Sequence, residues 1–575
     1  MKTFRTLIEL LSPFERRQAL VLMGLTLVAM VLETAGVGLV IPVLALVSDG
    51  KVPTWEILSH LTRTQMIIGV MLGLVLFYTI KAVFMIYLAW RQPSFSFSVG
   101  YNLSKSLFQG YLRQPYTFHL QRNSAQLIHN ATNEVGSVAN SGLLCALNLL
   151  SEVLVLVGIL VLMLWVEPFG TLAVIVLLGL AVWAYQHYTR ARILHWGRLR
   201  HYHEGMRIQC LQQGLGGAKD VKLLGREQDF FGQYDLHNTQ SNQVQKLQSL
   251  IGNVPRLWLE WFAVVALAAL VLSMLSHGKP VTQLVPTLGL FAAAAFRLMP
   301  SVNRMITNMQ NVRSALPAID HIHKEMTLFK NTPEIAPDLE RLVFKREIEI
   351  KNLGYVYHKA HKMALENIGL IIPKGSSVGF VGSSGAGKST LVDLILGLLT
   401  PLDGQICVDG QDIQTNLRQW QNLMGYVPQG IYLTDDTLRR NVAFGLSEDQ
   451  IDDQAVQKAI EAAQLDQFIA TLPLGLHTVV GERGIRLSGG QRQRIGIARA
   501  LYHHPEILVL DEATSSLDTE TEQGVMEAVR ALHGEKTVLI VAHRLSTVAH
   551  CDRLYRLEHG RLVQDNYSPQ PIVYA

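Results

Sequence analysis

Six long apolar runs, almost free of charged residues, constrain this chain more than any other feature of its sequence. A helix needs roughly 20 apolar residues to cross the hydrocarbon core of a membrane. All six runs lie in the N-terminal part of the chain: Ala19–Val47, Met66–Trp90, Leu143–Val166, Thr171–Tyr185, Trp258–Ser276 and Val281–Met299. Charged residues make up only 17% of the 575, whereas a typical soluble domain has about 25%. The sequence therefore predicts a region of six membrane-spanning helices.

Two of these runs invite other interpretations. The Thr171–Tyr185 run is short enough for a buried helix of a soluble protein, but the turn sequence at 167–170 favours a tight hairpin between two spans. The first run is too long for the apolar segment of a cleaved signal peptide, and five more runs follow it. Both runs are therefore interpreted as spans.

The distribution of Lys and Arg between the loops predicts the orientation of the spans. Two long loops, Arg91–Asn140 and Gln186–Pro255, are rich in Lys and Arg, as is the N-terminal segment, whereas the intervening loops are short and poor in them. Cytoplasmic loops of membrane proteins carry this excess, so both termini and both long loops are predicted to be cytoplasmic. The long loops show helical periodicity, and we expect the spans to continue into the cytoplasm as helices.

A different pattern begins near Ile348. The runs Ser377–Val381, Glu506–Leu510 and Thr537–Val541 are short, apolar and separated by helical segments, which is typical of strands buried on both faces of a parallel sheet. The predicted domains are a membrane domain at residues 1–325, a linker at 326–340 and a cytosolic α/β domain at 341–575. The four cysteines lie far apart and predict neither a metal site nor disulfides. The net charge of +4 is too small to indicate a nucleic-acid partner.

The strand at 377–381 leads into a glycine-rich sequence that matches GxxxxGK[ST], in the strand-to-helix context that this phosphate-binding motif requires. Lys388 is expected to reach the β- and γ-phosphates of a nucleotide, and Ser389 to hold Mg²⁺. The predicted nucleotide-binding residues of this loop are Gly382, Ser383, Ser384, Gly385, Ala386, Gly387, Lys388, Ser389 and Thr390. The predicted fold class is thus a polytopic α-helical membrane domain of six spans fused to a cytosolic α/β P-loop NTPase.

Two acids, Asp511 and Glu512, follow the apolar strand 506–510. Asp511 is suited to the Mg²⁺ shell and Glu512 to polarising the water that attacks the phosphate. Farther upstream, Leu487-Ser-Gly-Gly-Gln491 precedes a helix, so Ser488 and the backbone N–H groups of Gly489 and Gly490 can bind an anion at a helix N-terminus.

The Leu487–Gln491 segment resembles the signature loop of ATP-binding-cassette (ABC) proteins, and residues from about 340 to 565 resemble the whole cassette. The resemblance implies that Tyr357 stacks on adenine. It implies that Gln429 contacts both Mg²⁺ and the attacking water, and that His543 contacts the γ-phosphate as a switch residue. Asp518 resembles the aspartate of the D-loop, which here has Ser516 where alanine is commoner. The segment 481–484 resembles a loop through which exporters sense the membrane domain.

Six spans fused N-terminal to one cassette resemble the half-transporter arrangement of ABC exporters. In that family the signature loop completes the ATP site of a second cassette, so the resemblance implies a dimer, most simply a homodimer. It also implies ATP as substrate, Mg²⁺ as cofactor, and Glu512, His543 and Gln429 as the catalytic residues. When the two cassettes close on each other, the movement is expected to be transmitted to the spans through turns near Phe118–Arg122 and Leu224–Asp229.

Two other functional classes compete with active transport. An ATP-gated channel or sensor could share the fold, but it does not need a competent base in both sites, and Glu512 and His543 are both present. A soluble-type cassette acting in DNA repair or translation is excluded by the six spans.

The substrate is predicted chiefly from resemblance. The segments Glu33–Val43 and Ala295–Arg304 are similar to bacterial lipid-linked oligosaccharide flippases of protein glycosylation, which implies location in the cell inner membrane. At Pro53–Thr62, three apolar residues would share one helix face and resemble the short external helix of those flippases, although an ordinary loop fits nearly as well. Lipid A-type flippases and multidrug or peptide exporters remain alternatives.

Three cations, Lys81, Arg256 and Arg297, lie in or beside the apolar runs. An unpaired charge there costs on the order of 3 kcal/mol or more, so each is expected to face a cavity or a partner. The functional interpretation is a cationic track for the phosphate of a lipid headgroup. The structural alternative is pairing with Glu33, Glu152 or Glu260, or extension of the side chain to the membrane interface.

Overall fold

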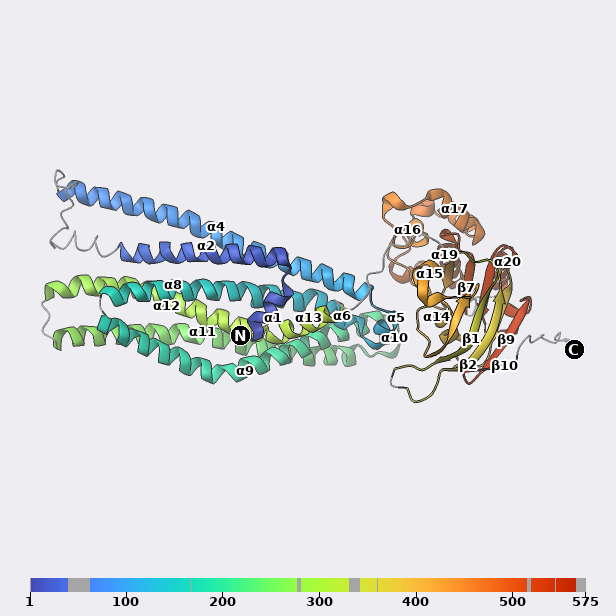
Figure 1. The fold of residues 1–575 in the computed structure, drawn as a ribbon, viewed down its shortest axis with the longest axis horizontal. Coiled ribbons are helices and arrows are strands. Elements are labelled where there is room, and N and C mark those ends of the chain that lie inside the picture. The colour runs from blue at the N-terminus through green and yellow to red at the C-terminus, as the bar shows by residue number, and fades with distance from the viewer. Residues whose placement is uncertain are drawn as a thin grey trace. The chain divides into compact units, whose positions relative to one another are not determined.

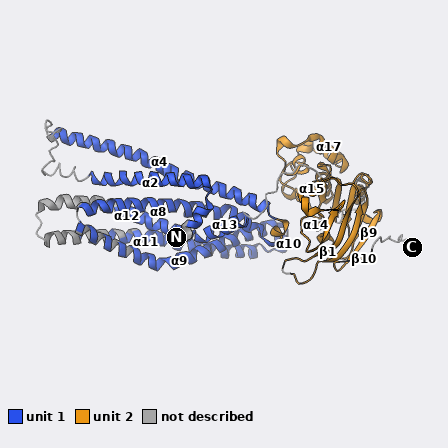
Figure 2. Cartoon of the chain, viewed as in Figure 1, with its two compact units in different colours: residues 1–114, 121–332 blue, residues 115–120, 333–575 orange. Residues whose placement is uncertain are grey.

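The computed structural model describes residues 2–39, 63–166, 168–276, 281–329, 342–358, 360–513, 519–542 and 544–564. The chain divides into two compact units, which are described separately (Figures 1 and 2). The first unit contains residues 1–114 and 121–332, and the second contains residues 115–120 and 333–575. The predicted external segment Pro53–Thr62 and residues 330–340 of the predicted linker lie outside the described residues; α13 contains residues 326–329.

Six long helices of the first unit coincide with the six apolar runs. They are α2 (Pro13–Gly38), α4 (Arg63–Leu112), α8 (Cys145–Val166), α9 (Pro168–Gly216), α11 (Glu227–Ser276) and α12 (Val281–Ser314). Because α4, α9 and α11 have 50, 49 and 50 residues, each is far longer than a span of roughly 20 residues. The expectation that spans continue as helices into the two long loops is therefore confirmed.

Short helices complete this part of the chain. They are α1 (Lys2–Leu10), α5 (Tyr116–Gln121), α6 (Ser124–His129), the π-helical turn η2 (Asn130–Glu134), α7 (Val135–Ser137), the π-helical turn η3 (Val138–Leu144), α10 (Ala218–Leu224) and α13 (Leu316–Phe329). Within the described residues, three stretches are long and apolar enough to cross a membrane by length and composition, namely Pro13–Gly38, Thr64–Leu112 and Ser124–Trp165.

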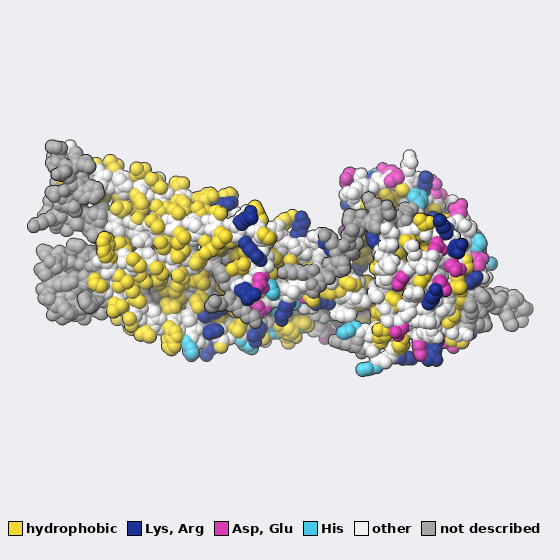
Figure 3. Space-filling model, in the orientation of Figure 1, with side chains coloured by type: hydrophobic (Ala, Val, Ile, Leu, Met, Phe, Trp, Pro, Cys, Tyr) yellow, Lys and Arg dark blue, Asp and Glu magenta, His cyan; other side chains and the backbone are white. Residues whose placement is uncertain are grey.

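The surface of the first unit is strongly apolar. On α4 the side chains of Leu72, Val83 and Ile86 are 66%, 64% and 69% exposed. Figure 3 shows apolar side chains over much of the visible face of this unit, with Lys and Arg gathered away from that area. A soluble protein rarely exposes so continuous an apolar surface, and lipid is the environment that covers it.

Close helix packing in this unit depends on a small residue. α2 packs against both α4 and α8, and a Cβ atom placed on Gly158 of α8 would lie 2.3 Å from Thr34 Oγ1 and 3.2 Å from Met30 Cγ of α2. Small residues allow helix backbones to approach closely where lipid removes the hydrophobic drive for association.

The second unit contains two sheets. The strands are β1 (Glu347–Tyr355), β2 (Leu365–Pro373), β3 (Ser377–Val381), β4 (Asp403–Val408), β5 (Gln411–Asp412), β6 (Met424–Val427), β7 (Ile507–Asp511), β8 (Thr537–Val541), β9 (Arg553–Glu558) and β10 (Arg561–Gln564). An antiparallel sheet has the order β2-β1-β4-β5, and a six-stranded sheet has the order β10-β9-β3-β8-β7-β6. In the latter, β9, β3, β8, β7 and β6 are parallel, as the buried apolar runs predicted.

The helices of this unit are α14 (Lys388–Ile395), α15 (Leu417–Gln421), α16 (Leu438–Val442), α17 (Asp453–Ala462), α18 (Asp466–Ala470), α19 (Gly489–Tyr502), α20 (Thr519–Arg530) and α21 (Leu545–Val548). Apolar residues of β7 and β8 contribute to two cores. Leu508, Leu510 and Val538 belong to one, and Ile507, Val509 and Leu539 belong to the other. Each strand is buried on both faces because its alternate side chains serve different cores.

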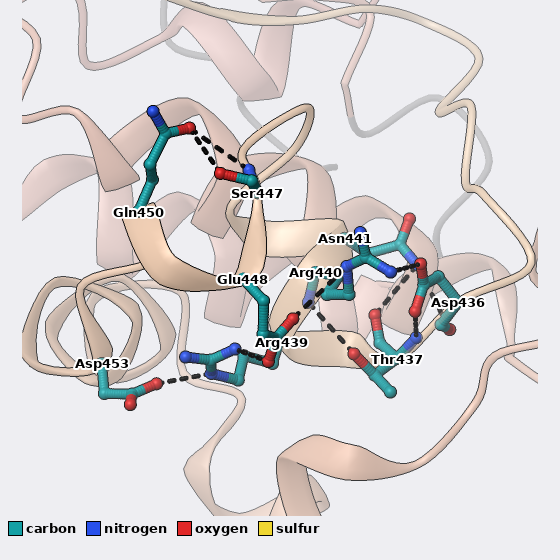
Figure 4. Close-up of polar contacts among 9 residues, drawn as sticks. All are labelled: Asp436, Thr437, Arg439, Arg440, Asn441, Ser447, Glu448, Gln450 and Asp453. Atoms are coloured by element: carbon teal, nitrogen blue, oxygen red, sulfur yellow. Dashed lines mark hydrogen bonds and ion pairs between the residues drawn. The ribbon is translucent and has the colours of Figure 1, made fainter.

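A polar network stabilises the helical part of this unit (Figure 4). The buried Arg439 of α16 donates to Glu448 and, over 2.5 Å, to Asp453 at the start of α17. Thr437 caps α16 by accepting from the backbone N–H of Arg440. The network thereby ties α16 to α17 through charge-assisted hydrogen bonds, which are among the stronger ones in proteins.

We expect Gly158→Val to destabilise the membrane unit by about 1–3 kcal/mol, because the added methyl groups force α2 and α8 apart. Gly24→Val is the matched control, since a Cβ on Gly24 of α2 meets no atom within 4 Å. Thermal unfolding of both variants in detergent measures the difference. Equal unfolding midpoints for the two variants would show that the close approach at Gly158 contributes nothing.

Candidate functional site

The candidate ATP site lies where neighbouring parallel strands end. β3 leads into Gly382, β6 leads toward Gln429, and β7 ends at Asp511. β8 lies between β3 and β7, and β6 is the next strand beyond β7. Because parallel strands place their carboxyl ends at one edge of the sheet, residues far apart in the sequence meet there.

Glycines give the phosphate-binding loop its shape. Gly387 has φ +101°, and a Cβ placed on it would lie 2.8 Å from the backbone oxygen of Ala364. Gly382 has φ +153°, and its Cβ would lie 2.2 Å from the backbone oxygen of Leu557. The loop can take this path only where these side chains are absent. Ser383, Ser384 and Gly385 at the loop tip are exposed, whereas Ala386 beneath them is buried.

Lys388 is the first residue of α14 and closes the loop on itself. Its ammonium group donates to the backbone oxygens of Gly382 and Ser383 over 2.9 and 3.0 Å. The residue is only 5% exposed, and burial lowers the pKa of the ammonium group, although Glu512 and Asp511 act in the opposite direction. This cation is thus held at the centre of the loop, where phosphate oxygens can replace the carbonyl acceptors.

Asp511 fits a role as a metal ligand. Its carboxylate is largely buried, and Oδ1 has no hydrogen-bond partner among the described residues. Burial raises the pKa of this carboxyl and the neighbouring Glu512 raises it further, while Lys388 and a hydrogen bond from Ser389 act against both effects. An orphaned buried carboxylate oxygen beside the exposed Ser389 hydroxyl matches the oxygen ligands that Mg²⁺ prefers.

Glu512 and Gln429 meet directly at this edge. Gln429 Nε2 donates to Glu512 Oε2 over 2.8 Å. Glu512 has φ +49°, an uncommon conformation for a residue other than glycine, and its backbone N–H donates to Val541 of β8. The backbone thus fixes the direction in which the Glu512 carboxylate leaves the sheet.

The aromatic residue expected at adenine adjoins the same loop. The Tyr357 hydroxyl lies 3.0 Å from Thr390 Oγ1, and its ring meets the Tyr355 ring edge-on. Tyr357 is 37% exposed, so part of the ring remains available for stacking.

The signature loop forms a complete capping box. The Ser488 hydroxyl accepts from the backbone N–H of Gln491 over 3.2 Å, and the Gln491 side chain accepts from the backbone N–H of Ser488 over 2.8 Å. α19 begins at Gly489, and Leu487 accepts a hydrogen bond from Arg492. Because the first N–H groups of a helix lack intrahelical acceptors, Gly489 and Gly490 lie where an anion binds.

The fold brings two further residues to this region that no sequence motif indicates. Asp393 of α14 has its pKa raised to about 6 by burial and by the nearby Asp511. Arg499 of α19 donates to the backbone oxygens of Asn441 and Tyr432, so the signature helix is bound to the segment that follows Gln429. Neither residue belongs to a recognisable motif, and only tertiary contacts reveal them.

Some predicted site residues lie outside the described part of the chain. Asp518, Ser516 and His543 are not described, so their roles remain predictions. Arg256 lies in α11 and Arg297 in α12, but their side chains are likewise not described.

Lys81 forms an ion pair with a glutamate, as the structural alternative predicted, and also lines a cavity. Its ammonium group pairs with Glu33 over 2.8 Å and lies 4.9 Å from the centre of the Tyr78 ring. Both side chains of the ion pair line a cavity of about 400 Å³, together with Glu152 and Arg304. Arg304 pairs with Glu152 over 2.5 Å, and Ser301 donates to the same carboxylate.

A larger cavity of about 700 Å³ in the membrane unit shares Arg304 with the smaller one. Its lining is rich in amide side chains, contributed by Gln92, Asn148, Gln248, Asn253, Asn303, Asn308, Gln310 and Asn311. Amide groups both donate and accept hydrogen bonds, so this cavity suits a ligand with many hydroxyl groups.

Comparison with known families identifies the chain. Residues 23–299 match the family description "ABC transporter transmembrane region", and residues 365–515 match "ABC transporter". An ATP-dependent lipid A-core flippase of Nitrosococcus oceani is 32% identical over 469 residues, which cover 80% of this chain and 77% of that protein. The chain belongs to the ABC transporter family. It has the exporter half-transporter arrangement, and its cassette couples ATP hydrolysis to transport.

Other relatives of this ABC transporter agree. The lipid A-core flippases of Cupriavidus pinatubonensis and Vibrio cholerae are 31% and 30% identical, and the alignments cover 80% and 81% of this chain and 78% and 80% of those proteins. A solved structure of a bacterial Atm1-family ABC exporter with ATP bound is similar, with a TM-score of 0.78 and 25% identity. That match covers 96% of this chain and 95% of the other.

We expect Glu512→Gln to keep ATP binding but to reduce hydrolysis about 100-fold or more, the loss typical of removing a general base. The amide keeps the shape and the contact with Gln429 but does not accept a proton. Single-turnover hydrolysis and nucleotide binding, measured on the same preparation, test this. Glu535→Gln is the surface control, and retention of a third of wild-type hydrolysis by Glu512→Gln would exclude Glu512 as the base.

We expect Ser488→Arg to abolish hydrolysis by acting on a second cassette. In a heterodimer of Ser488→Arg and Lys388→Ala chains with different tags, one composite site carries both changes and the other carries neither. ATP turnover confined to one site per dimer is the expected result. An absence of any intact site, with nucleotide binding also lost, would contradict sharing of the site between chains.

Proposed function

We propose that this ABC exporter is a homodimeric flippase that uses ATP to move an anionic glycolipid from the inner to the outer face of a bacterial inner membrane. One observation carries the proposal: cavities of the membrane unit combine Arg304 and Lys81, each paired with a glutamate, with many amide side chains. A sugar-bearing headgroup with phosphate needs both kinds of partner, because hydroxyls require donors and acceptors whereas phosphate requires fixed cations.

At the candidate ATP site, each polar residue of the sheet edge has a proposed role. Lys388 exchanges its two carbonyl acceptors for β- and γ-phosphate oxygens, and Tyr357 stacks on adenine. Ser389, Asp511 and Gln429 hold Mg²⁺, which neutralises charge on the phosphates when bound. Glu512 accepts the proton of the attacking water, and Gln429 and His543 orient the reacting groups.

A second chain completes this site in the proposal. Residues of the signature loop face the γ-phosphate held by the partner cassette, namely Leu487, Ser488, Gly489, Gly490 and Gln491. Asp518 keeps the D-loop role that the resemblance implies. ATP then favours the closed dimer through contacts made only in that state, and hydrolysis removes them. Both termini and the long helical extensions face the cytoplasm, as the distribution of Lys and Arg predicts.

Two glycolipid classes compete as substrate. The names of the relatives favour a lipid A-type glycolipid, whereas similarity at Glu33–Val43 and Ala295–Arg304 favours a lipid-linked oligosaccharide used in protein glycosylation. Both classes combine sugars with phosphate, so the cavity lining supports either one. The relatives match along most of the chain, and we therefore place the lipid A-type substrate first. Multidrug or peptide export and an ATP-gated channel rank below both.

We expect Arg304→Ala or Lys81→Ala to reduce the number of glycolipids flipped per ATP by about tenfold, because each loses a charge-assisted hydrogen bond to phosphate. Arg256→Ala and Arg297→Ala should act in the same direction, with partial recovery in the lysine variants, which keep the charge but lose the planar fork. Lys105→Ala, an exposed change elsewhere on α4, is the control.

The measurement is flipping and ATP hydrolysis in the same proteoliposomes. Lipid A, a polyprenyl-diphosphate oligosaccharide and a neutral glycolipid are compared as substrates. Stimulation of flipping and ATP hydrolysis by lipid A, but not by the neutral glycolipid, supports the assignment of a lipid A-type substrate. Equal flipping of all three lipids, or normal flipping by all four alanine variants, would contradict a phosphate-binding track.

A further inference from the structure

A cluster of two histidines and a glutamate lies in the first unit, with His129 and Glu134 buried and His201 half-buried. His129 ends α6, Glu134 ends the π-helical turn η2, and His201 belongs to α9. Glu134 Oε1 lies 3.0 Å from His129 Nε2 and 2.7 Å from His201 Nδ1. One potential ligand atom from each residue lies within 4.8 Å of those of the other two. Two imidazoles and a carboxylate form the donor set of many zinc sites.

The π-helical turn is what brings His129 and Glu134 together. In an α-helix with 3.6 residues per turn, residues five apart point about 140° away from each other. A π-helix closes its hydrogen bonds between residues i and i+5, so residues at this spacing lie nearly above one another. The π-helical turn therefore aligns a histidine and a carboxylate that an α-helix would separate.

The burial of the cluster leaves ligand capacity unused. His129 is 2% exposed and Glu134 is 3% exposed. Glu134 Oε2 is buried and has no hydrogen-bond partner among the described residues. Buried charges in proteins are normally paired or bound to a metal. A carboxylate oxygen that is left over beside two imidazole nitrogens is thus positioned to bind a cation.

A fourth potential ligand lies beside the three. The ring centre of His321, in α13, is 5.5 Å from that of His201, and His321 Nε2 is also buried without a partner among the described residues. The nearby acid Glu325 accepts from Arg122 through Oε1 over 2.6 Å, and its Oε2 is also buried without a partner among the described residues. His321 is not among the three residues whose ligand atoms all lie within 4.8 Å of one another. It is the neighbouring imidazole that a side-chain movement would bring into a tetrahedral shell.

We propose that His129, Glu134 and His201 bind a divalent transition-metal ion, best matched by Zn²⁺, with His321 as the fourth ligand. Zinc bonds of 2.0–2.1 Å at tetrahedral angles separate ligand atoms by about 3.3 Å. The present 2.7 and 3.0 Å contacts need to open by about 0.3–0.6 Å, and the two imidazole nitrogens lie within 4.8 Å of each other. The ion joins α6 and η2 to α9 and α13, so it acts as a clamp among cytoplasmic helical extensions of the spans. This inference does not depend on the identity of the transported lipid.

Metal binding to the full-length, nucleotide-free protein tests the proposal. The protein is purified through a tag that contains no histidine and is then stripped of metal. Competition against a chromophoric zinc chelator gives stoichiometry and affinity, and Mg²⁺ serves as the hard-cation comparison. We expect one Zn²⁺ per chain, no displacement by millimolar Mg²⁺, and a visible Co²⁺ spectrum typical of four-coordinate nitrogen and oxygen ligands.

Variants then assign the site. His129→Gln, Glu134→Gln and His201→Gln should each weaken Zn²⁺ binding by about 100-fold or more, and His321→Gln by about tenfold or more. The control is His203→Gln in the same helix, which removes a separate histidine pair with His237 and should leave the affinity unchanged. Absence of Zn²⁺ binding, wild-type affinity in His129→Gln, or loss in His203→Gln alone would overturn the proposal. An unchanged affinity in His321→Gln would overturn its assignment as fourth ligand. If a variant does not fold, the Co²⁺ spectrum of the wild-type protein decides, and an octahedral spectrum would count against the site.

Discussion

Parallel strands end at the same edge of their sheet, and the described polar groups of the candidate ATP site depend on that constraint. Lys388, Gln429 and Asp511 are separated by tens of residues, yet β3, β6 and β7 deliver them to one place. Burial lowers the pKa of Lys388 and raises that of Asp511, while the attraction between their opposite charges acts against both shifts. The arrangement favours a ligand that supplies anionic oxygens to the lysine and a cation to the aspartate.

Contacts beyond the sheet connect this edge to the signature helix. Arg499 of α19 binds backbone oxygens in the segment after Gln429, and burial lowers its pKa to about 10, still well above neutral pH. The guanidinium therefore stays charged and keeps these contacts. Arg499 thus ties the helix α19 to the segment that follows Gln429 within one cassette.

In the membrane unit the dominant constraint is the absence of water from the bilayer. Every backbone N–H and C=O group must then be hydrogen-bonded within a helix. Ion pairs between side chains therefore become the specific contacts between helices. Lys81 with Glu33 and Arg304 with Glu152 show this pairing. In the parts of this unit beyond the apolar runs, the π-helical turn at 130–134 adds a second kind of polar cluster, that of His129, Glu134 and His201.

The sequence by itself determined the six spans, the strand-to-loop context of Lys388 and the acids after β7, because apolar length and motif spacing are local properties. It predicted a cavity-facing or paired Lys81 but left the choice open, and the fold combines both. Only the tertiary structure decided the contacts of Arg304, Arg499 and the histidine cluster. Their partners lie on other helices, and a π-helical turn leaves no recognisable pattern in the sequence. A motif can be recognised from neighbouring residues in the sequence, whereas the pairing of distant side chains depends on how the helices pack.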